Sequence, residues 1–238
     1  MSARRFPNPV FVALDVPDVG RAVAIARAVK PYVGGLKIGL EFITACGPDG
    51  VRTIAALDMP LFADVKFHDI PNTVAAASRE LAKLGSTMFN VHASGGERMM
   101  RDAAEAARAV DPRVMVLGVT VLTSIDDSVI DSVGQRGPAA EQVVRLARLV
   151  KKSGLDGVVC SAHEIAGIRK VCGPDFLLVV PGIRPAGADR ADQKRVMTPG
   201  EAHRAGADIL VIGRPITAAA DPAEAARAIA VELVETTT

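Results

Sequence analysis

Three charged residues in one short stretch have the spacing of a proton-transfer site. Asp64 and Lys66 lie two residues apart, and Asp69 follows three residues later. On a β-strand, side chains two residues apart point to the same side. A lysine ammonium flanked by carboxylates keeps its charge at neutral pH, because nearby opposite charges favour the ionised form. Such a lysine suits the role of proton donor better than that of Schiff-base nucleophile, which needs a neutral amine.

An ion-pair network without catalytic function is the alternative interpretation of these residues. Two further charged residues weigh against it, because Asp15 and Lys37 also stand at the ends of short apolar runs, earlier in the chain. Burying several charges together costs desolvation energy and is weak evidence for a stabilising role. The combination therefore favours a catalytic site.

Two arginines and a glycine near the C-terminus indicate a phosphate site. Gly213 and Arg214 directly follow the last apolar run, and Arg184 follows the run before it. Glycine allows a close approach of the backbone to an anion, a helix that starts there offers free N–H groups, and arginine binds phosphate through paired hydrogen bonds. A turn with a surface arginine is the alternative for an isolated Gly-Arg pair, but the position after the last strand favours phosphate.

Short apolar runs alternate with Ala-rich amphipathic stretches along the whole chain. The runs are rich in Val, Ile and Leu, as buried parallel strands are. The stretches between them repeat apolar residues every three or four positions, as surface helices do. The expected strands are 10–14, 35–38, 61–65, 88–91, 114–119, 157–160, 177–180 and 209–212, and the expected helices include 19–29, 74–84, 98–109, 139–152 and 223–234.

This alternation predicts a single α/β domain over residues 1–238, a (β/α)8 TIM barrel. An open flavodoxin-like sheet is the alternative, but it normally has fewer strands and a phosphate loop after the first strand, where no Gly-rich loop occurs here. In a barrel of this type the active site lies at the C-terminal ends of the strands, which is where the charged residues fall. The long segment 182–198, rich in Gly, Pro and Arg, is expected to be a lid over the substrate rather than an unstructured insertion.

Composition excludes several classes of protein. The net charge is +1 and aromatic residues make up 3%, so neither nucleic acid nor an anionic membrane is an expected partner. No apolar run is long enough to span a bilayer, and residues 1–9 are not followed by a signal-peptide core, so we expect a cytoplasmic protein. The three cysteines lack metal-ligand spacing and are expected to be packing residues. We expect His68 and His92 to be structural and His163 and His203 to lie at the surface.

The segments around these residues occur together in one enzyme family. The stretch 64–73 reads Asp-Val-Lys-Phe-His-Asp-Ile-Pro-Asn-Thr and is highly specific. Further segments follow in the family's order from the first strand to the last: 12–15, 36–39, 121–124, 181–185, 193–195 and 212–217. On these motifs the chain resembles the orotidine 5′-phosphate decarboxylase family, whose members form UMP and need no metal or organic cofactor.

The resemblance implies a role for each charged residue on the first three strands. Asp15 and Lys37 would hold the ribose hydroxyls, with Lys37 also linked into the charged network. Asp64 would lie beside the substrate carboxylate, and Lys66 would protonate C6 of the pyrimidine as carbon dioxide leaves. Asp69 and Thr73 would reach into the active site of the other subunit of a homodimer. Helix capping by Asn72 or Thr73 is the alternative for Thr73.

The remaining implied roles concern the base and the phosphate. Thr123 would contact the pyrimidine, and Gln193 on the lid would bridge base and phosphate. Arg184 would lie at the base of the lid, with Gly213 and Arg214 binding the phosphate.

Two rival functions are compatible with parts of this pattern. A sugar-phosphate lyase such as 3-keto-gulonate-phosphate decarboxylase resembles the chain at the Asp-x-Lys-x-x-Asp motif but uses Mg²⁺. Its acidic residue is replaced here by Lys37, which would repel a divalent cation. A non-catalytic sensor of nucleotide phosphates would keep Gly213 and Arg214 but would not need Asp64, Lys66 and Asp69.

Overall fold

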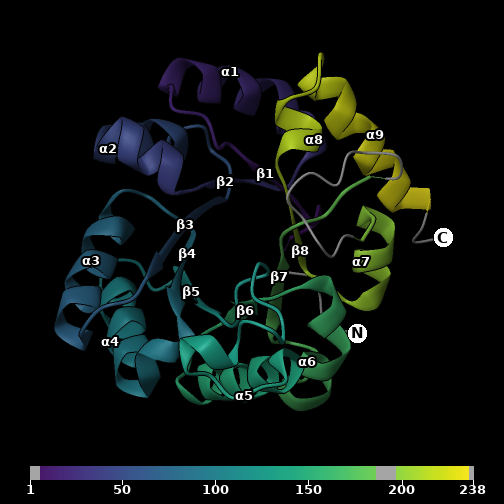
Figure 1. Ribbon diagram of the computed structural model, residues 1–238. Coiled ribbons are helices and arrows are strands. Elements are labelled where there is room, and N and C mark those ends of the chain that lie inside the picture. The colour runs from purple at the N-terminus through teal and green to yellow at the C-terminus, as the bar shows by residue number, and fades with distance from the viewer. Residues whose placement is uncertain (1–5, 186–196, 236–238) are drawn as a thin grey trace.

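Eight parallel strands form a closed barrel in the computed structural model, which describes residues 6–185 and 197–235. Each strand is hydrogen-bonded to the next in chain order, and β8 pairs with β1. The strands ring the centre of the molecule and the helices lie outside them (Figure 1). The predicted TIM barrel is therefore confirmed, and the open sheet is excluded. The strands are β1 (Val10–Ala13), β2 (Gly35–Ile38), β3 (Leu61–Phe67), β4 (Met88–His92), β5 (Met115–Val119), β6 (Gly157–Val159), β7 (Leu177–Val180) and β8 (Ile209–Ile212).

Each strand is followed by a helix that packs on the outside of the barrel. All expected strands occur, with ends within two residues of the predicted ones, because their apolar composition marks burial on both faces. The helices are α1 (Val19–Val29), α2 (Leu40–Ala55), α3 (Pro71–Lys83), α4 (Gly96–Arg108), α5 (Ala139–Lys152), α6 (Ile165–Cys172), α7 (Pro199–Ala205), α8 (Arg214–Thr217) and α9 (Pro222–Glu235). Within the described part of the chain, no helix has the length and apolar character needed to cross a membrane.

The interior of the barrel is filled by alternate residues of the strands. Phe11, Phe62, Met88, Leu117 and Val211 belong to this inner cluster. A larger cluster lies between the strands and the surrounding helices. The alternation along each strand predicts which polar residues near the C-terminal ends face the barrel axis.

Two arginine–aspartate pairs lie at the N-terminal end of the barrel. Asp156, just before β6, accepts hydrogen bonds from Arg108 of α4 and from the backbone N–H of Val116, each at 2.8 Å. Asp208, just before β8, accepts from Arg169 of α6 and from the backbone N–H of Leu178. Each carboxylate thus ties a helix to a neighbouring strand.

One prediction about the surface is wrong. His203 lies on α7 and is buried, with 7% of the residue exposed, although it was expected at the surface. The helix has seven residues and packs against α9, so Pro199, Gly200 and Ala202 are buried with it. Its short length leaves little of its circumference facing solvent. His163 is exposed as expected.

Candidate active site

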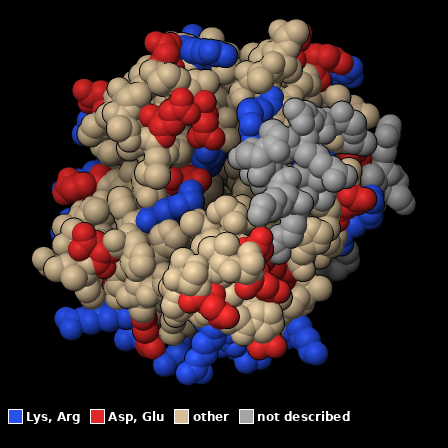
Figure 2. Space-filling model, in the orientation of Figure 1, with Lys and Arg blue, Asp and Glu red and all other residues tan. Residues whose placement is uncertain are grey.

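Two adjoining cavities open at the C-terminal ends of the strands. One has a volume of about 180 Å³ and a mainly apolar lining, and the other has a volume of about 370 Å³ and a mainly charged lining. They share Asp64, Pro181 and Val211. Figure 2 shows basic and acidic side chains meeting in a hollow on this face of the molecule. The charged cavity is lined by six of the predicted site residues: Asp15, Lys37, Asp64, Arg184, Gly213 and Arg214.

Asp15 and Lys37 form an ion pair between the ends of β1 and β2. The Lys37 ammonium donates to both carboxylate oxygens of Asp15, at 2.6 and 2.7 Å. Its side chain is 7% exposed, whereas that of Asp15 is 44% exposed. A Cβ at Gly39 would lie 2.7 Å from an Asp15 oxygen and 3.0 Å from the Lys37 ammonium, so a side chain there would displace this pair.

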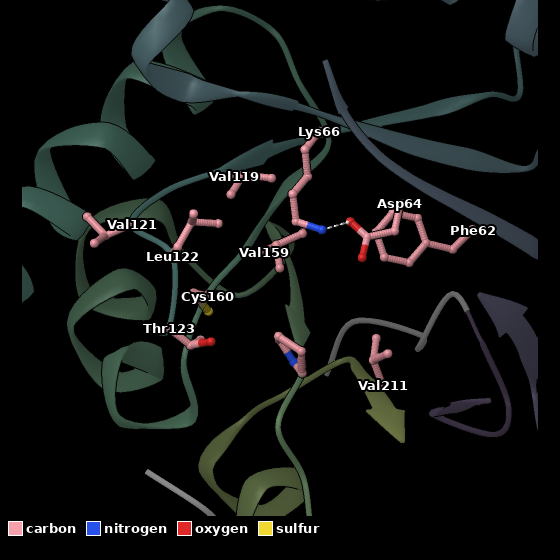
Figure 3. Close-up of a pocket in the computed structure, with 11 residues that line it drawn as sticks. Phe62, Asp64, Lys66, Val119, Val121, Leu122, Thr123, Val159, Cys160 and Val211 are labelled. Atoms are coloured by element: carbon pink, nitrogen blue, oxygen red, sulfur yellow. Dashed lines mark hydrogen bonds and ion pairs between the residues drawn. The ribbon is translucent and has the colours of Figure 1, made fainter. Parts of the chain in front are cut away.

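Asp64 and Lys66 form a second pair at the end of β3. The Lys66 ammonium donates to Asp64 Oδ1 at 2.6 Å, with side chains 30% and 19% exposed. The two groups point toward each other beside the apolar cavity (Figure 3). The prediction that they share one side is confirmed. Among the described residues, no hydrogen bond joins this pair to Lys37, but Lys37 and Asp64 line the same cavity.

β3 does not reach this geometry as a regular strand. The pairing of β3 with β4 shifts register between Ala63 and Phe67, and Lys66 has a positive φ of 51°. Its backbone N–H donates to Asn90 Oδ1 at 2.7 Å. Asn90 was not predicted to be a site residue. It is polar and lies two positions after Met88, which faces the barrel axis, so alternation along the strand could have identified it.

Asp69 and Thr73 line neither of the two cavities. Both are exposed, and Asp69 Oδ1 accepts a hydrogen bond from the backbone N–H of Ile70 at 2.6 Å. Helix α3 begins at Pro71 and has Ile70 as its N-cap, without a side-chain capping bond. Capping by Asn72 or Thr73 is therefore excluded.

Arg184, Gly213 and Arg214 converge on the charged cavity from β7 and β8. Arg184 is buried, and its guanidinium donates to the Ile183 carbonyl at 2.9 Å. Its backbone N–H donates to the carbonyl of Met197 at 3.1 Å, so the two ends of the predicted lid lie together. Gln193 and the rest of 186–196 lie outside the described residues. A Cβ at Gly213 would meet only Ala13, at 3.5 Å, so protein packing alone does not require glycine there.

The apolar cavity is lined mainly by hydrophobic side chains from several strands. Leu122 and Thr123, from the loop after β5, lie on its wall, and Lys66 and Asp64 lie at its edge (Figure 3). Cys160 also lines it. Burial raises the pKa of the Cys160 thiol far above its ordinary value, with Glu164 adding to the rise, so this thiol is protonated at neutral pH.

Two histidines stack beside the Asp64–Lys66 pair. The rings of His68 and His92 are 5.3 Å apart between centroids, at 33°. The pKa of His92 is lowered from 6.5, chiefly by burial and further by the charges of His68 and Lys66. Neither ring lines a cavity described above.

The sequence matches a known family over almost its whole length. Residues 8–229 match the model of the orotidine 5′-phosphate decarboxylase / HUMPS family. The chain belongs to this family. The resemblance inferred from the sequence motifs is thereby confirmed.

Individual family members agree with this assignment. The orotidine 5′-phosphate decarboxylase of Paramagnetospirillum magneticum is 52% identical, over 95% of this chain and 98% of that protein. The corresponding protein of Moorella thermoacetica is 54% identical, over 95% of this chain and 92% of that protein. The crystal structure of orotidine 5′-phosphate decarboxylase from Lactobacillus acidophilus has a TM-score of 0.84 at 40% identity and covers 95% of this chain and 99% of that chain.

Proposed function

We propose that this protein decarboxylates orotidine 5′-phosphate to UMP, the final step of de novo pyrimidine nucleotide synthesis, without a metal or organic cofactor. The observation that carries the proposal is the Lys66 ammonium, held at 2.6 Å from Asp64 at the edge of an apolar cavity. The family and the names of its similar members point to the same reaction. Within it, Lys66 is the acid that protonates C6 of the pyrimidine.

The chemistry explains why a fixed ammonium is needed. Loss of carbon dioxide leaves an electron pair on a ring carbon that has no conventional electron sink. A preorganised cation aimed at that carbon stabilises the charge as it develops, and it then delivers the proton. Asp64 holds the Lys66 ammonium in place before substrate binds. On binding, Asp64 would lie beside the substrate carboxylate.

The two cavities divide the substrate by polarity. The pyrimidine fits the apolar cavity, with Thr123 on its wall. The ribose fits between the cavities, near Asp15 and Lys37, and the phosphate binds to Gly213 and Arg214. Arg184 would lie at the base of the 182–198 lid, and Gln193 would bridge base and phosphate. Phosphate contacts remote from the reacting carbon supply binding energy that lid closure can use at the reacting centre.

The rival Mg²⁺-dependent lyase is disfavoured by Lys37. Its ammonium lies 2.6 Å from Asp15, in the charged cavity, where it would repel a divalent cation. The test is incubation of EDTA-treated protein with orotidine 5′-phosphate, following the loss of orotate absorbance and the appearance of UMP. We expect full activity in EDTA. Activity that disappears in EDTA and returns with Mg²⁺ would overturn the proposal.

The functional unit in this proposal is a homodimer in which Asp69 and Thr73 complete the partner's site. Both are exposed, and neither lines either cavity of its own chain. Between them Ile70 is 67% exposed, an apolar side chain that a subunit interface would bury. In a C2 dimer each subunit would then complete the other's site.

Complementation tests the shared site. Lys66→Ala and Asp69→Ala are each expected to be inactive, whereas a mixed dimer contains one site with both residues intact. Random reassortment of equal amounts makes half of the dimers mixed, so recovery approaches about a quarter of wild-type activity. No recovery, with subunit exchange demonstrated by differently tagged chains, would place Asp69 in its own subunit's site.

A further inference from the structure

The side chain of Asn90 bridges the two residues of the proposed proton-transfer pair. It lies on β4, is 0% exposed, and faces the barrel axis two positions after Met88. Its Nδ2 donates to Asp64 Oδ1 at 2.7 Å, and its Oδ1 accepts from the backbone N–H of Lys66 at 2.7 Å. Asp64 Oδ1 also accepts from the Lys66 ammonium, which closes a ring of three hydrogen bonds. Asn90 therefore holds Lys66 at both ends, directly at the backbone and through Asp64 at the ammonium.

The irregular course of β3 makes this bridge necessary. β3 pairs with β4 at Ala63↔Phe89 and again at Phe67↔Val91, so three residues of β3 stand opposite Asn90 alone. A bulge of this kind interrupts the ladder of backbone hydrogen bonds. The Lys66 N–H, displaced from the ladder, finds the Asn90 side chain instead. The bond also supports the positive φ of 51° at Lys66, a conformation that is unfavourable for a non-glycine residue.

We infer that Asn90 is a positioning residue for the decarboxylation, fixing the backbone of Lys66 and the carboxylate of Asp64 so that the ammonium keeps its aim at the substrate carbon. This inference rests on the function proposed above. Asn90 lines neither cavity, so it acts through the two residues that it holds. An amide suits this position at any pH, because one bond needs an acceptor and the other a donor.

The first test is Asn90→Leu, which keeps the approximate volume and removes both bonds. A misplacement of about 1 Å in a catalytic group can cost roughly 10²-fold, so we expect kcat to fall by about that factor. KM should stay within about threefold, because the residues proposed to bind ribose and phosphate lie on other strands. Retention of kcat within a few fold in folded protein, or a rise in KM with kcat unchanged, would overturn the inference.

The second test is the pH profile of Asn90→Asp. Two carboxyl groups at hydrogen-bonding distance share a proton, and the singly protonated pair offers a donor toward Asp64 and an acceptor toward the Lys66 N–H. We expect kcat of this variant to be low at high pH and to rise as pH falls, with no such rise in Asn90→Leu. Other titratable groups near Asp64 and Lys66 are His92 and His68, which stack on each other, and the groups that line the same cavities, Asp15, Lys37, Glu41 and Cys160. Wild type and Asn90→Leu keep all of them and control for their titration.

The two variants together decide whether Asn90 is a positioning residue. If Asn90→Leu does not fold, the profile of Asn90→Asp alone decides, and a profile parallel to that of wild type would overturn the inference. Lys66→Ala, measured in parallel, separates this inference from the function beneath it. Loss of activity in Lys66→Ala with normal kcat in Asn90→Leu would remove only the role of Asn90, whereas an active Lys66→Ala would remove the proposed proton donor itself.

Discussion

At the N-terminal end of the barrel Asp208 accepts hydrogen bonds from Arg169 and from the backbone N–H of Leu178, whereas at the C-terminal end Asp64 accepts from the side chains of Lys66 and Asn90. The exposed fractions are similar, at 30% for the Asp208 side chain and 19% for that of Asp64. Burial therefore does not distinguish the two carboxylates. The difference lies in what each one joins.

The Asp208 pair joins helix to strand. Arg169 donates to the carbonyls of Gly173, Pro174 and Gly206 as well as to the carboxylate. Nearly all of its donor capacity is thus used within the fold. The Lys66 ammonium, by contrast, has Asp64 as its partner and faces a cavity, which leaves donor capacity for a substrate. Charges at one end hold the barrel together, and charges at the other are available for chemistry.

The largest effect is expected when the cation at the C-terminal end is removed. Lys66→Ala should lower kcat by roughly 10⁴-fold or more, because both the proton donor and the stabilising charge are lost. Circular dichroism and urea unfolding should show an intact fold. Lys83→Ala, at an exposed pair on α3, is the matched control and should retain wild-type kcat. Near-normal turnover in Lys66→Ala would show that the charges at the C-terminal end of the barrel are not needed for catalysis.

Removing a carboxylate at the N-terminal end should lower the stability of the protein and leave its kcat unchanged, the reverse of the result expected for Lys66→Ala. Asp208→Ala leaves Arg169 and the Leu178 N–H without their shared acceptor. The free energy of unfolding should fall by about 2–4 kcal/mol, between the value of one charged hydrogen bond and that of a broken buried pair. Urea unfolding measures this change, and kcat at low temperature should stay near wild type. Glu224→Gln, at an exposed pair on α9, should change stability by less than about 1 kcal/mol.

Arg214 tests whether a charged residue at the C-terminal end of the barrel binds the substrate phosphate. Arg214→Ala should lower kcat/KM for orotidine 5′-phosphate. The corresponding loss of transition-state stabilisation should be about 1.5–3 kcal/mol, the contribution of one charged hydrogen-bonding partner. Added guanidinium ion should restore part of the loss. Arg27→Ala, on the outer helix α1, is the control and should be neutral. Equal activity of Arg214→Ala and wild type would show that Arg214 is an ordinary surface residue.

The smallest effect is expected from His92. Its pKa is lowered in the folded protein, so below about pH 6.5 the unfolded chain binds the proton more readily than the folded one. Neutral His92 therefore does not reduce the free energy of unfolding above about pH 6.5. As pH falls from there toward the lowered pKa of His92 in the folded protein, the free energy of unfolding decreases. Urea midpoints of wild type should therefore drop more between about pH 7.5 and about pH 5.5 than those of His92→Gln. Parallel curves would contradict the shift.

Part of the site could be predicted because side chains alternate along a strand. Alternation placed Asp64 and Lys66 together, and the two do form an ion pair, but they meet across a bulge at which Lys66 has a positive φ and not along a regular strand. The bulge in β3 could not be predicted, because it depends on how β4 pairs with β3 and not on the local sequence. The inward-facing position of Asn90 was visible in the alternation, but its two hydrogen bonds depend on the same bulge and could not be predicted. The pairing of Lys37 with Asp15 is likewise a tertiary contact between two strands.

A crystal structure of the protein with UMP bound would test directly whether Lys66 is positioned to protonate C6 of the pyrimidine. The measured quantity is the distance from Lys66 Nζ to C6 of the pyrimidine. The account predicts about 3–3.5 Å, the separation of groups poised to react, with the ring in the apolar cavity and the phosphate on Gly213 and Arg214. UMP bound away from the β3 end of the barrel, or bound there with the Lys66 ammonium turned away from C6, would contradict it.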